Sequence, residues 1–192
     1  MKFIETDLAG SYIVEPEPFE DDRGTFQRVW CEREFAEAGI GGRPAQANLA
    51  QNHRAGTLRG LHLQLPPAAE TKLVRCTRGA VWDVIVDLRP DSPTFLHHVG
   101  VELSAVNRRA LWVPELFAHG YLTLDDESDT FYQVGSFYAP GQEIGLRWDD
   151  PALAISWPRT ATTLSQKDQS WPDLDAEDLA ARVRRAVETT RD

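Results

Sequence analysis

The chain has 192 residues, of which 42% are hydrophobic and 26% charged, and its formal net charge is -10. This length fits one domain with a substantial core. The acidic balance argues against a general affinity for nucleic acid or for an anionic membrane. It leaves room for one anionic small molecule, such as a phosphorylated compound, held by a local cluster of Arg and Lys.

The cysteines and the N-terminus indicate the compartment. Cys31 and Cys76 show neither disulfide-like nor zinc-like spacing, so both are interpreted as reduced thiols. Residues 1–7 carry acidic side chains where a signal peptide needs an apolar run. No stretch approaches the roughly 18 apolar residues of a membrane span. We therefore expect a cytoplasmic protein without a membrane partner.

The N-terminal part is expected to contain short elements. Residues 11–16 predict a short strand that ends in a Pro-containing turn. Residues 19–30 predict a polar turn at Gly24 and then an alternating strand. One face of that strand is expected to carry Phe26, Arg28 and Trp30. Residues 32–38 predict a short helix, which a glycine ends.

From residue 45 to residue 134, short apolar stretches alternate with turn residues, and no helical period competes with them. Strands are predicted over residues 47–52, 57–63, 71–78, 80–88, 97–103, 110–113, 118–123 and 130–134. A spacing of about 8 to 12 residues between strands is typical of an antiparallel sandwich or barrel. The fold class is therefore expected to be all-β, with a jelly roll as the favoured form.

The C-terminal part is expected to cover the barrel. Residues 145–158 predict irregular, aromatic-rich segments packed over it. Residues 175–189 predict an amphipathic surface helix. Its apolar positions are Leu179, Val183, Ala186 and Val187. The domain organisation expected is one β domain over residues 1–174 and a helical tail over residues 175–192.

Charged and polar side chains interrupt two apolar runs that otherwise resemble core strands. Residues 57–64 contain Arg59 and His62, and Lys72 follows in the next run. Such groups are seldom fully buried unless they are paired or functional. In a regular strand Arg59 and His62 point to opposite faces, but a bulge at Gly60 would turn both to one side. Taken alone, His62 is more often a core histidine satisfied by hydrogen bonds.

A second histidine in an apolar setting, His119, suggests that two imidazoles line one cavity. Metal-binding jelly rolls of the cupin type use His-x-His and a downstream Glu, followed by Pro-x-Gly-x-x-His. The comparable residues here are His62, Gln64, Glu70, Pro114 and His119. Because Gln is a poor substitute for imidazole at a transition-metal site, a metal-dependent enzyme is the weaker alternative, and no metal is predicted.

Several further polar residues are candidates for a site. Asp83 and Asp87 share one face of a predicted strand, and either can orient a histidine or pair with Arg89. The remaining candidates, to which spacing alone assigns no role, are Tyr132, Tyr138 and Asp168.

Ordered motifs over residues 10–174 resemble the dTDP-4-dehydrorhamnose 3,5-epimerases, which are cupin-type jelly rolls of nucleotide-sugar metabolism. The principal motifs are Asp22-Arg23-Gly24-x-Phe26, Gln46-x-Asn48, Gly56-Thr57-Leu58-Arg59-Gly60-Leu61-His62-x-Gln64, Lys72-Leu73-Val74, Phe117-Ala118-His119-Gly120, Tyr138-x-Pro140, Trp148-x-Asp150-Pro151 and Leu164-Ser165-x-Lys167-Asp168. So many blocks in the same order make a chance resemblance very improbable. Residues 28–31 resemble a divergent branch.

The resemblance implies a cofactor-independent epimerase of a nucleotide-linked 4-keto-6-deoxyhexose, whose ketone acidifies the protons on C3 and C5. The favoured conversion is dTDP-4-dehydro-6-deoxy-D-glucose to dTDP-4-dehydro-L-rhamnose. By resemblance His62 is the base, Tyr132 is the acid, Asp168 orients the imidazole and Lys72 stabilises the enolate oxygen. No cofactor is expected, because the substrate carbonyl accepts the electron pair.

The resemblance also assigns nucleotide recognition. Arg59 and His119 are expected to contact the diphosphate. The other substrate-binding residues that the resemblance implies are Gln46, Asn48, Tyr138, Glu143 and Lys167, together with Arg28, which stands at a position associated with the nucleotide. Arg23 is expected at the nucleotide end, supplied by the neighbouring subunit of a homodimer in which residues 1–45 form the contact.

The chain departs from the family pattern at several positions. Arg28 replaces a common Glu, and Ala50 and Asn52 stand where Ser is common. Leu116 replaces the usual Gly and is expected to narrow the approach to His119. The alternatives left open are inversion of C3 or C5 alone and a different nucleotide-linked keto sugar. A non-catalytic sugar-nucleotide binding module is a third possibility, although it would not need a base and an acid together.

Overall fold

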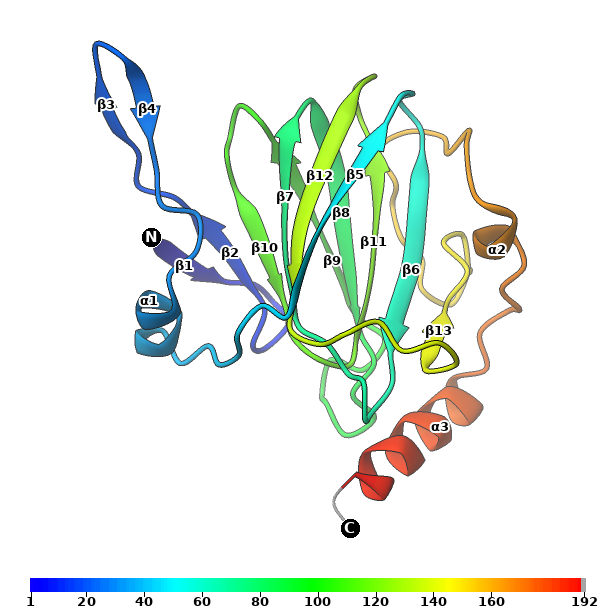
Figure 1. The fold of residues 1–192 in the computed structure, drawn as a ribbon. Coiled ribbons are helices and arrows are strands. Elements are labelled where there is room, and N and C mark those ends of the chain that lie inside the picture. The colour runs from blue at the N-terminus through cyan, green and yellow to red at the C-terminus, as the bar shows by residue number, and fades with distance from the viewer. Residues whose placement is uncertain (191–192) are drawn as a thin grey trace.

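The computed structural model describes residues 1–190 and contains two packed antiparallel sheets (Figure 1). The first sheet has the order β1 (Lys2–Glu5), β2 (Tyr12–Glu15), β10 (Ala110–Val113), β7 (Lys72–Arg78), β12 (Ser128–Val134) and β5 (Gln46–Asn52). The second has the order β13 (Glu143–Gly145), β6 (Leu58–Gln64), β11 (Phe117–Thr123), β8 (Ala80–Asp87) and β9 (His98–Ser104). The remaining elements are the hairpin of β3 (Phe19–Asp21) and β4 (Gly24–Phe26) and the helices α1 (Glu32–Glu37), α2 (Gln166–Gln169) and α3 (Ala176–Thr189). The all-β jelly roll is therefore confirmed.

The strands expected between residues 45 and 134 correspond to β5 through β12, with ends that differ by no more than two residues. The elements that the sequence did not reveal are β1, β3, β13 and α2, each of at most four residues. Elements this short show too few repeats of a strand or helix period to be recognised.

The strand expected to run to Trp30 is wrong. It ends at Phe26, and Arg28 and Trp30 lie outside any strand. The β3–β4 hairpin projects from the body of the molecule (Figure 1), so no second layer requires the alternation to continue. Phe26 is 74% exposed, whereas Trp30 is partly buried and packs against the apolar cluster that contains Phe35 of α1.

Strand β8 explains how the core is divided. Its residues Val81 and Ile85 face the space between the sheets. Val84 and Val86 face a second apolar cluster, on the other side of the sheet, which includes Leu179 and Val183 of α3. Both faces are therefore buried, as expected for an almost unbroken apolar run. Asp83 lies on the face directed between the sheets.

Helix α3 packs against the second apolar cluster and shields it from solvent. Leu179, Ala180 and Val183 are buried on it, and the side chain of Asp175 caps its first turn. The predicted amphipathic helix is thus confirmed, and residues 191–192 of the expected tail lie outside the described part. None of the helices within residues 1–190 is long and apolar enough to cross a membrane.

The pairing of β6 with β11 brings Arg59 and His62 to one face. His62 pairs with His119 and Arg59 with Tyr121, so three steps along β6 match two steps along β11. Residues two apart in a strand share a face. The extra residue of β6 therefore turns Arg59 and His62 into the same cavity, as expected from Gly60.

Gly60 is required by this geometry. Its φ is +126°, and a Cβ atom there would lie 2.5 Å from the Cα of Gly120 and 2.9 Å from the carbonyl oxygen of His119. Both neighbours are backbone atoms of the paired strand, so neither can rotate away.

We predict that Gly60→Ala lowers the free energy of unfolding by at least about 2 kcal/mol. The reason is that the strained φ and the backbone collision add to each other. Gly42→Ala is the control, because Gly42 has a φ of +108° and its added Cβ would lie no closer than 3.7 Å to a neighbour. Denaturant unfolding measures both variants, and equal losses would show that the close approach is unimportant.

Candidate active site

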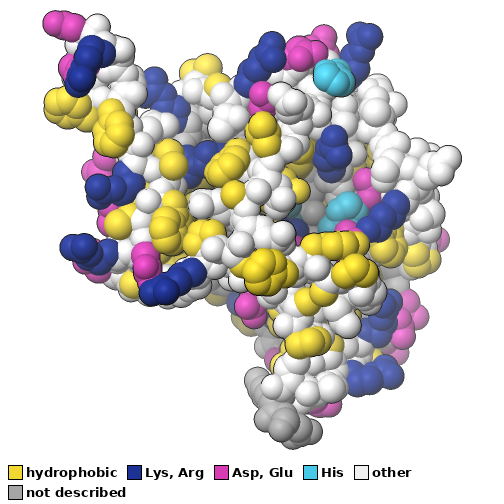
Figure 2. Space-filling model, in the orientation of Figure 1, with side chains coloured by type: hydrophobic (Ala, Val, Ile, Leu, Met, Phe, Trp, Pro, Cys, Tyr) yellow, Lys and Arg dark blue, Asp and Glu magenta, His cyan; other side chains and the backbone are white. Residues whose placement is uncertain are grey.

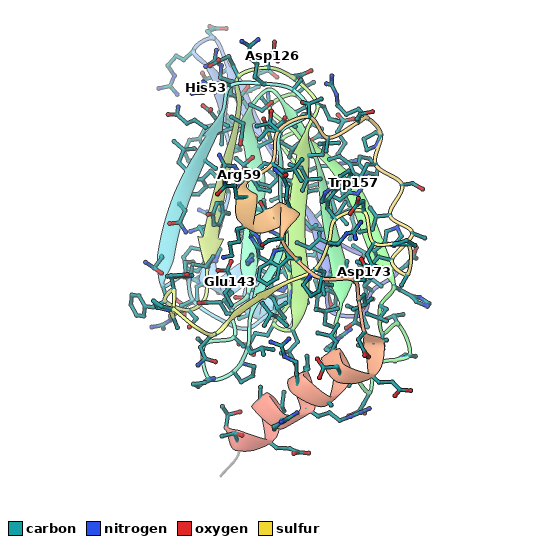
Figure 3. The ribbon with its side chains drawn as sticks, turned by 90° about the vertical axis from the view of Figure 1, so that its right-hand side faces the viewer. His53, Arg59, Asp126, Glu143, Trp157 and Asp173 are labelled. Carbon is teal, nitrogen blue, oxygen red and sulfur yellow. The ribbon has the colours of Figure 1, made fainter. Side chains whose placement is uncertain are left out.

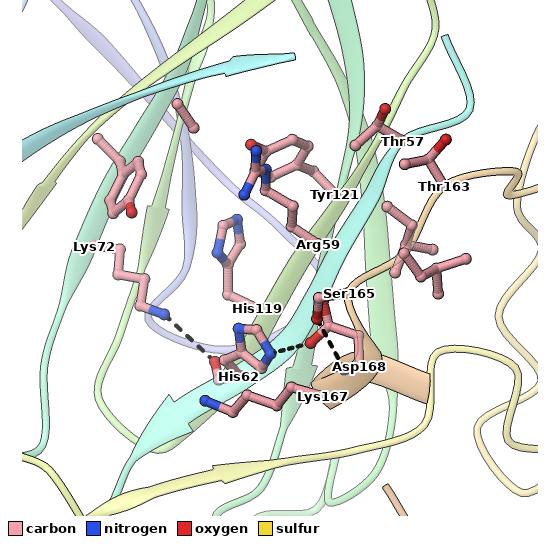
Figure 4. A pocket seen from close by; sticks show the side chains of 14 residues that line it. Thr57, Arg59, His62, Lys72, His119, Tyr121, Thr163, Ser165, Lys167 and Asp168 are labelled. Carbon is pink, nitrogen blue, oxygen red and sulfur yellow. Dashed lines mark hydrogen bonds and ion pairs between the residues drawn. The ribbon is translucent and has the colours of Figure 1, made fainter. Parts of the chain in front are cut away.

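A cavity of about 480 Å³ opens between the two sheets. It lies between β6 and β11 on one side and β7 and β12 on the other. Figure 2 shows histidine and basic side chains gathered around the hollow on this face, and Figure 4 shows the residues within it. The sequence-predicted residues that line it are Arg59, His62, Lys72, His119, Tyr132, Lys167 and Asp168.

His62 and Asp168 form the shortest polar contact to a histidine in the cavity. The Nε2 of His62 lies 2.6 Å from Oδ1 of Asp168, and Asp168 is only 3% exposed. Burial alone would raise the pKa of Asp168, but its hydrogen bonds and the charge of His62 lower that pKa below its ordinary value. An ionised carboxylate only accepts, so His62 donates its Nε2–H to Asp168, and its Nδ1 lies 3.7 Å from Oε1 of Glu143.

The short helix α2 brings Asp168 to the cavity. Ser165 caps it by accepting a hydrogen bond from the Asp168 backbone N–H at 3.0 Å. In Figure 3 the helix lies over β6, between Arg59 and Glu143. Asp168 therefore reaches His62 from a segment that lies 106 residues further along the chain.

Lys72 places a positive charge beside His62. Its Nζ lies 3.4 Å from the carbonyl oxygen of His62 and 3.3 Å from Oε1 of Glu70. Lys72 is 7% exposed, so its ammonium group is largely shielded from solvent. The pairing with Glu70 compensates the cost of burying that charge.

Tyr132 faces the same cavity from β12. Burial raises the pKa of its phenol above the ordinary value of 10.0, Arg59 opposes the shift, and Glu70 adds to it. Tyr132 therefore remains protonated at neutral pH and can donate its proton.

His119 is held by a different carboxylate. Its Nε2 lies 2.9 Å from Oδ1 of Asp83, which is fully buried. Asp87 instead pairs with Arg89 at 2.7 Å. Of the two roles expected for these aspartates, Asp83 therefore orients a histidine and Asp87 pairs with Arg89.

A second recess of about 330 Å³ shares His62, Lys72 and Tyr132 with the first. Its other sequence-predicted residues are Gln46, Asn48, Tyr138 and Glu143. Glu143 also pairs with Lys167, which connects the two recesses. Both volumes fall in the range of small-molecule sites, about 300 to 1,000 Å³.

Two predicted binding residues do not reach this cavity from their own chain. Arg23 lies on the β3–β4 hairpin and pairs with Asp21, and Arg28 pairs with Glu34. Arg23 is 89% exposed in its side chain.

The expected effect of Leu116 is wrong. Leu116 has a φ of +63° and packs against the second apolar cluster, in a groove formed with Arg89 and Val187. Its side chain is directed away from the space between the sheets, so it does not narrow the approach to His119.

The donor set does not fit a cupin metal centre. The side-chain oxygen of Gln64 accepts from the backbone N–H of Ala139 at 2.7 Å, and Glu70 pairs with Lys72. His62 and His119 are each bound to a separate aspartate. Within residues 1–190, no group of three or more His, Cys, Asp or Glu side chains is arranged to hold a metal ion.

The arrangement can instead transfer protons. It combines the imidazole of His62, the protonated phenol of Tyr132 and the ammonium group of Lys72 beside one cavity, with the guanidinium of Arg59 at the cavity wall. These are the groups needed to remove a proton next to a carbonyl, stabilise the enolate and return a proton.

Sequence reasoning assigned no role to two residues that support the site, although it identified Asn52 as a departure from the family pattern. Tyr121 lines the cavity, and Asn52 accepts a hydrogen bond from Arg59. Strand alternation from His119 would have revealed Tyr121, and alternation from Asn48 would have revealed Asn52.

Comparisons with known proteins agree with this chemistry. The family model described as dTDP-4-dehydrorhamnose 3,5-epimerase matches residues 5–176. An enzyme of that name from Shigella flexneri is 45% identical over 180 residues, which cover 91% of this chain and 98% of the relative. A dTDP-4-dehydrorhamnose 3-epimerase from Streptomyces niveus is 41% identical, over 84% of this chain and 78% of the relative.

A solved structure gives the same result for the fold. The dTDP-6-deoxy-D-glucose-3,5-epimerase of Legionella pneumophila, in complex with dTDP-4-keto-L-rhamnose, matches with a TM-score of 0.86 and 38% identity, over 92% of this chain and 95% of that one. The chain therefore belongs to the dTDP-4-dehydrorhamnose 3,5-epimerase family.

Proposed function

We propose that the protein converts dTDP-4-dehydro-6-deoxy-D-glucose to dTDP-4-dehydro-L-rhamnose by inverting C5 and C3. The single observation that carries the proposal is the His62–Asp168 hydrogen bond, at 2.6 Å, in the same cavity as the protonated phenol of Tyr132. A base and an acid contributed by opposite sheets suit removal of a proton from one face of a sugar and its return to the other.

In the proposed reaction, Nδ1 of His62 takes the proton from the carbon next to the ketone. The electron pair of the broken C–H bond moves to the ketone oxygen and forms an enolate, which the Lys72 ammonium group stabilises. The carbon then takes the phenol proton of Tyr132 on its opposite face as the ketone re-forms. Exchange with solvent restores both residues, and the same steps act on the second carbon.

Nucleotide binding is proposed for the cavity wall that carries Arg59 and His119 and for the second recess. Arg59 contacts the diphosphate through its terminal N–H groups, and His119, which Asp83 holds in place at Nε2, lies beside it. The recess lined by Gln46, Asn48 and Tyr138 would then accept the nucleoside. A cytoplasmic location remains a prediction from the sequence.

A homodimer is part of the proposal. The β3–β4 hairpin projects from the body and pairs Phe19 with Phe26, which are 66% and 74% exposed. Aromatic surface of this kind marks an interaction site. We propose that the hairpin docks on a second copy and brings Arg23 to the nucleotide end of the partner's cavity.

An alternative is inversion of one carbon only. It is favoured by the 3-epimerase from Streptomyces niveus, which is 41% identical to this chain. The catalytic roles proposed above would be unchanged.

In D2O, we predict that His62→Ala lowers deuterium incorporation into the substrate at least about 100-fold, because the base is lost. Tyr132→Phe keeps incorporation but forms little inverted product, because the proton returns from the face of His62. NMR of the sugar measures both, with dTDP binding by calorimetry as the control for folding. Normal turnover in either variant would remove that residue from the mechanism.

We predict that Glu70→Gln moves the alkaline limb of the pH–rate profile to lower pH. The acid must be protonated, so activity is lost as pH rises through the pKa of Tyr132. Glu70 raises that pKa, and removing its charge lowers it. Glu102→Gln, an exposed substitution on β9, is the control. An unchanged limb, or one at higher pH, would contradict the role of Tyr132.

Mixed dimers test the proposed exchange of hairpins. We predict that Arg23→Ala and His62→Ala homodimers are each impaired and that co-expressed mixed dimers regain activity. In such a dimer, the subunit with an intact His62 receives an intact Arg23 from its partner. Failure to regain activity, or a wild-type monomer in light scattering, would overturn the proposed dimer.

A further inference from the structure

A buried amide next to the cavity has no part in the function proposed above. Asn52 is 3% exposed and ends β5, on the strand face that also carries Asn48. Its Oδ1 accepts a hydrogen bond from Nε of Arg59 at 2.8 Å. Its Nδ2 donates to the carbonyl oxygen of Ser128 at 2.9 Å.

These two contacts fix the orientation of the amide. A backbone carbonyl can only accept and a guanidinium can only donate, so a flipped amide would lose both bonds. The hydroxyl of Tyr121 lies 3.3 Å from Nδ2 and 3.4 Å from Oδ1. Asn52 is thus a fixed acceptor aimed at Arg59.

The partner of Arg59 is neutral, unlike those of the other cations in the cavity. Lys72 pairs with Glu70, and Lys167 pairs with Glu143. Arg59 uses its Nε on an amide, and within residues 1–190 no carboxylate forms a salt bridge with it. Its charge is not neutralised, and its terminal N–H groups remain available to an anion.

We infer that Asn52 is the positioning residue that holds Arg59 ready for the diphosphate. The inference rests on the proposed function, because it assumes that Arg59 binds that group. By anchoring Nε, Asn52 limits the rotation of a long side chain and directs its two terminal nitrogens into the cavity. Less conformational freedom is then lost when the diphosphate binds.

We expect Asn52→Ala to raise the Kd for dTDP about tenfold, the size of one hydrogen bond to a charged group. The kcat should fall less than the affinity, because Asn52 acts on binding through Arg59. Gln51→Ala is the control, since Gln51 is exposed on the other face of the same strand and should bind dTDP normally. Calorimetry gives Kd, and a thermal melt checks folding.

A double-mutant cycle separates positioning from a general structural role. In an Arg59→Ala background, Asn52→Ala should weaken dTDP binding no further. Asn52→Asp is a second variant of nearly the same shape, and it should weaken binding more than Asn52→Ala because its carboxylate neutralises Arg59.

The inference is overturned if Asn52→Ala binds dTDP normally, or if it weakens binding by the same factor with and without Arg59. In either case the wild type still binds dTDP and exchanges deuterium, so the proposed function stands. A wild type that neither binds dTDP nor exchanges deuterium would overturn both.

Discussion

The close approach of β6 to β11 at Gly60 and Gly120 is the constraint on which the site depends. It allows one extra residue in β6, so that Arg59 and His62 enter one cavity although they are three positions apart. Without it, the proposed base and the proposed diphosphate-binding group would lie on opposite faces of the sheet. The backbone conformation at Gly60 therefore places Arg59, the proposed diphosphate-binding residue, and His62, the proposed base, in the same cavity.

The site also shows how a protein with a net charge of -10 can be suited to an anionic ligand. Each histidine in the cavity is held by a buried carboxylate, and the Lys72 ammonium group is paired with Glu70. Arg59 differs, because its partner is a neutral amide. Positive charge is therefore concentrated at one wall of the cavity, where a diphosphate would lie, and acidic groups fix the geometry elsewhere.

Strands with a nearly continuous apolar run, such as β8, could be predicted from sequence because both of their faces are buried and turn residues bound them. The bulge was suggested by Gly60, and the division of roles between Asp83 and Asp87 was left open until the fold placed them. The short elements could not be predicted, because β13 and α2 form through tertiary contacts with β6 rather than through a periodic pattern. Motif resemblance located Asp168, which local reasoning would have assigned to a solvated loop.

The central claim is that one cavity removes and returns protons on both carbons next to the ketone. Its most direct test is NMR of dTDP-4-dehydro-6-deoxy-D-glucose incubated with the wild-type protein in D2O. We expect deuterium at both C3 and C5, with the product in the L-rhamnose configuration. Deuterium at a single carbon would contradict double inversion, and its absence from both would contradict the proposed function.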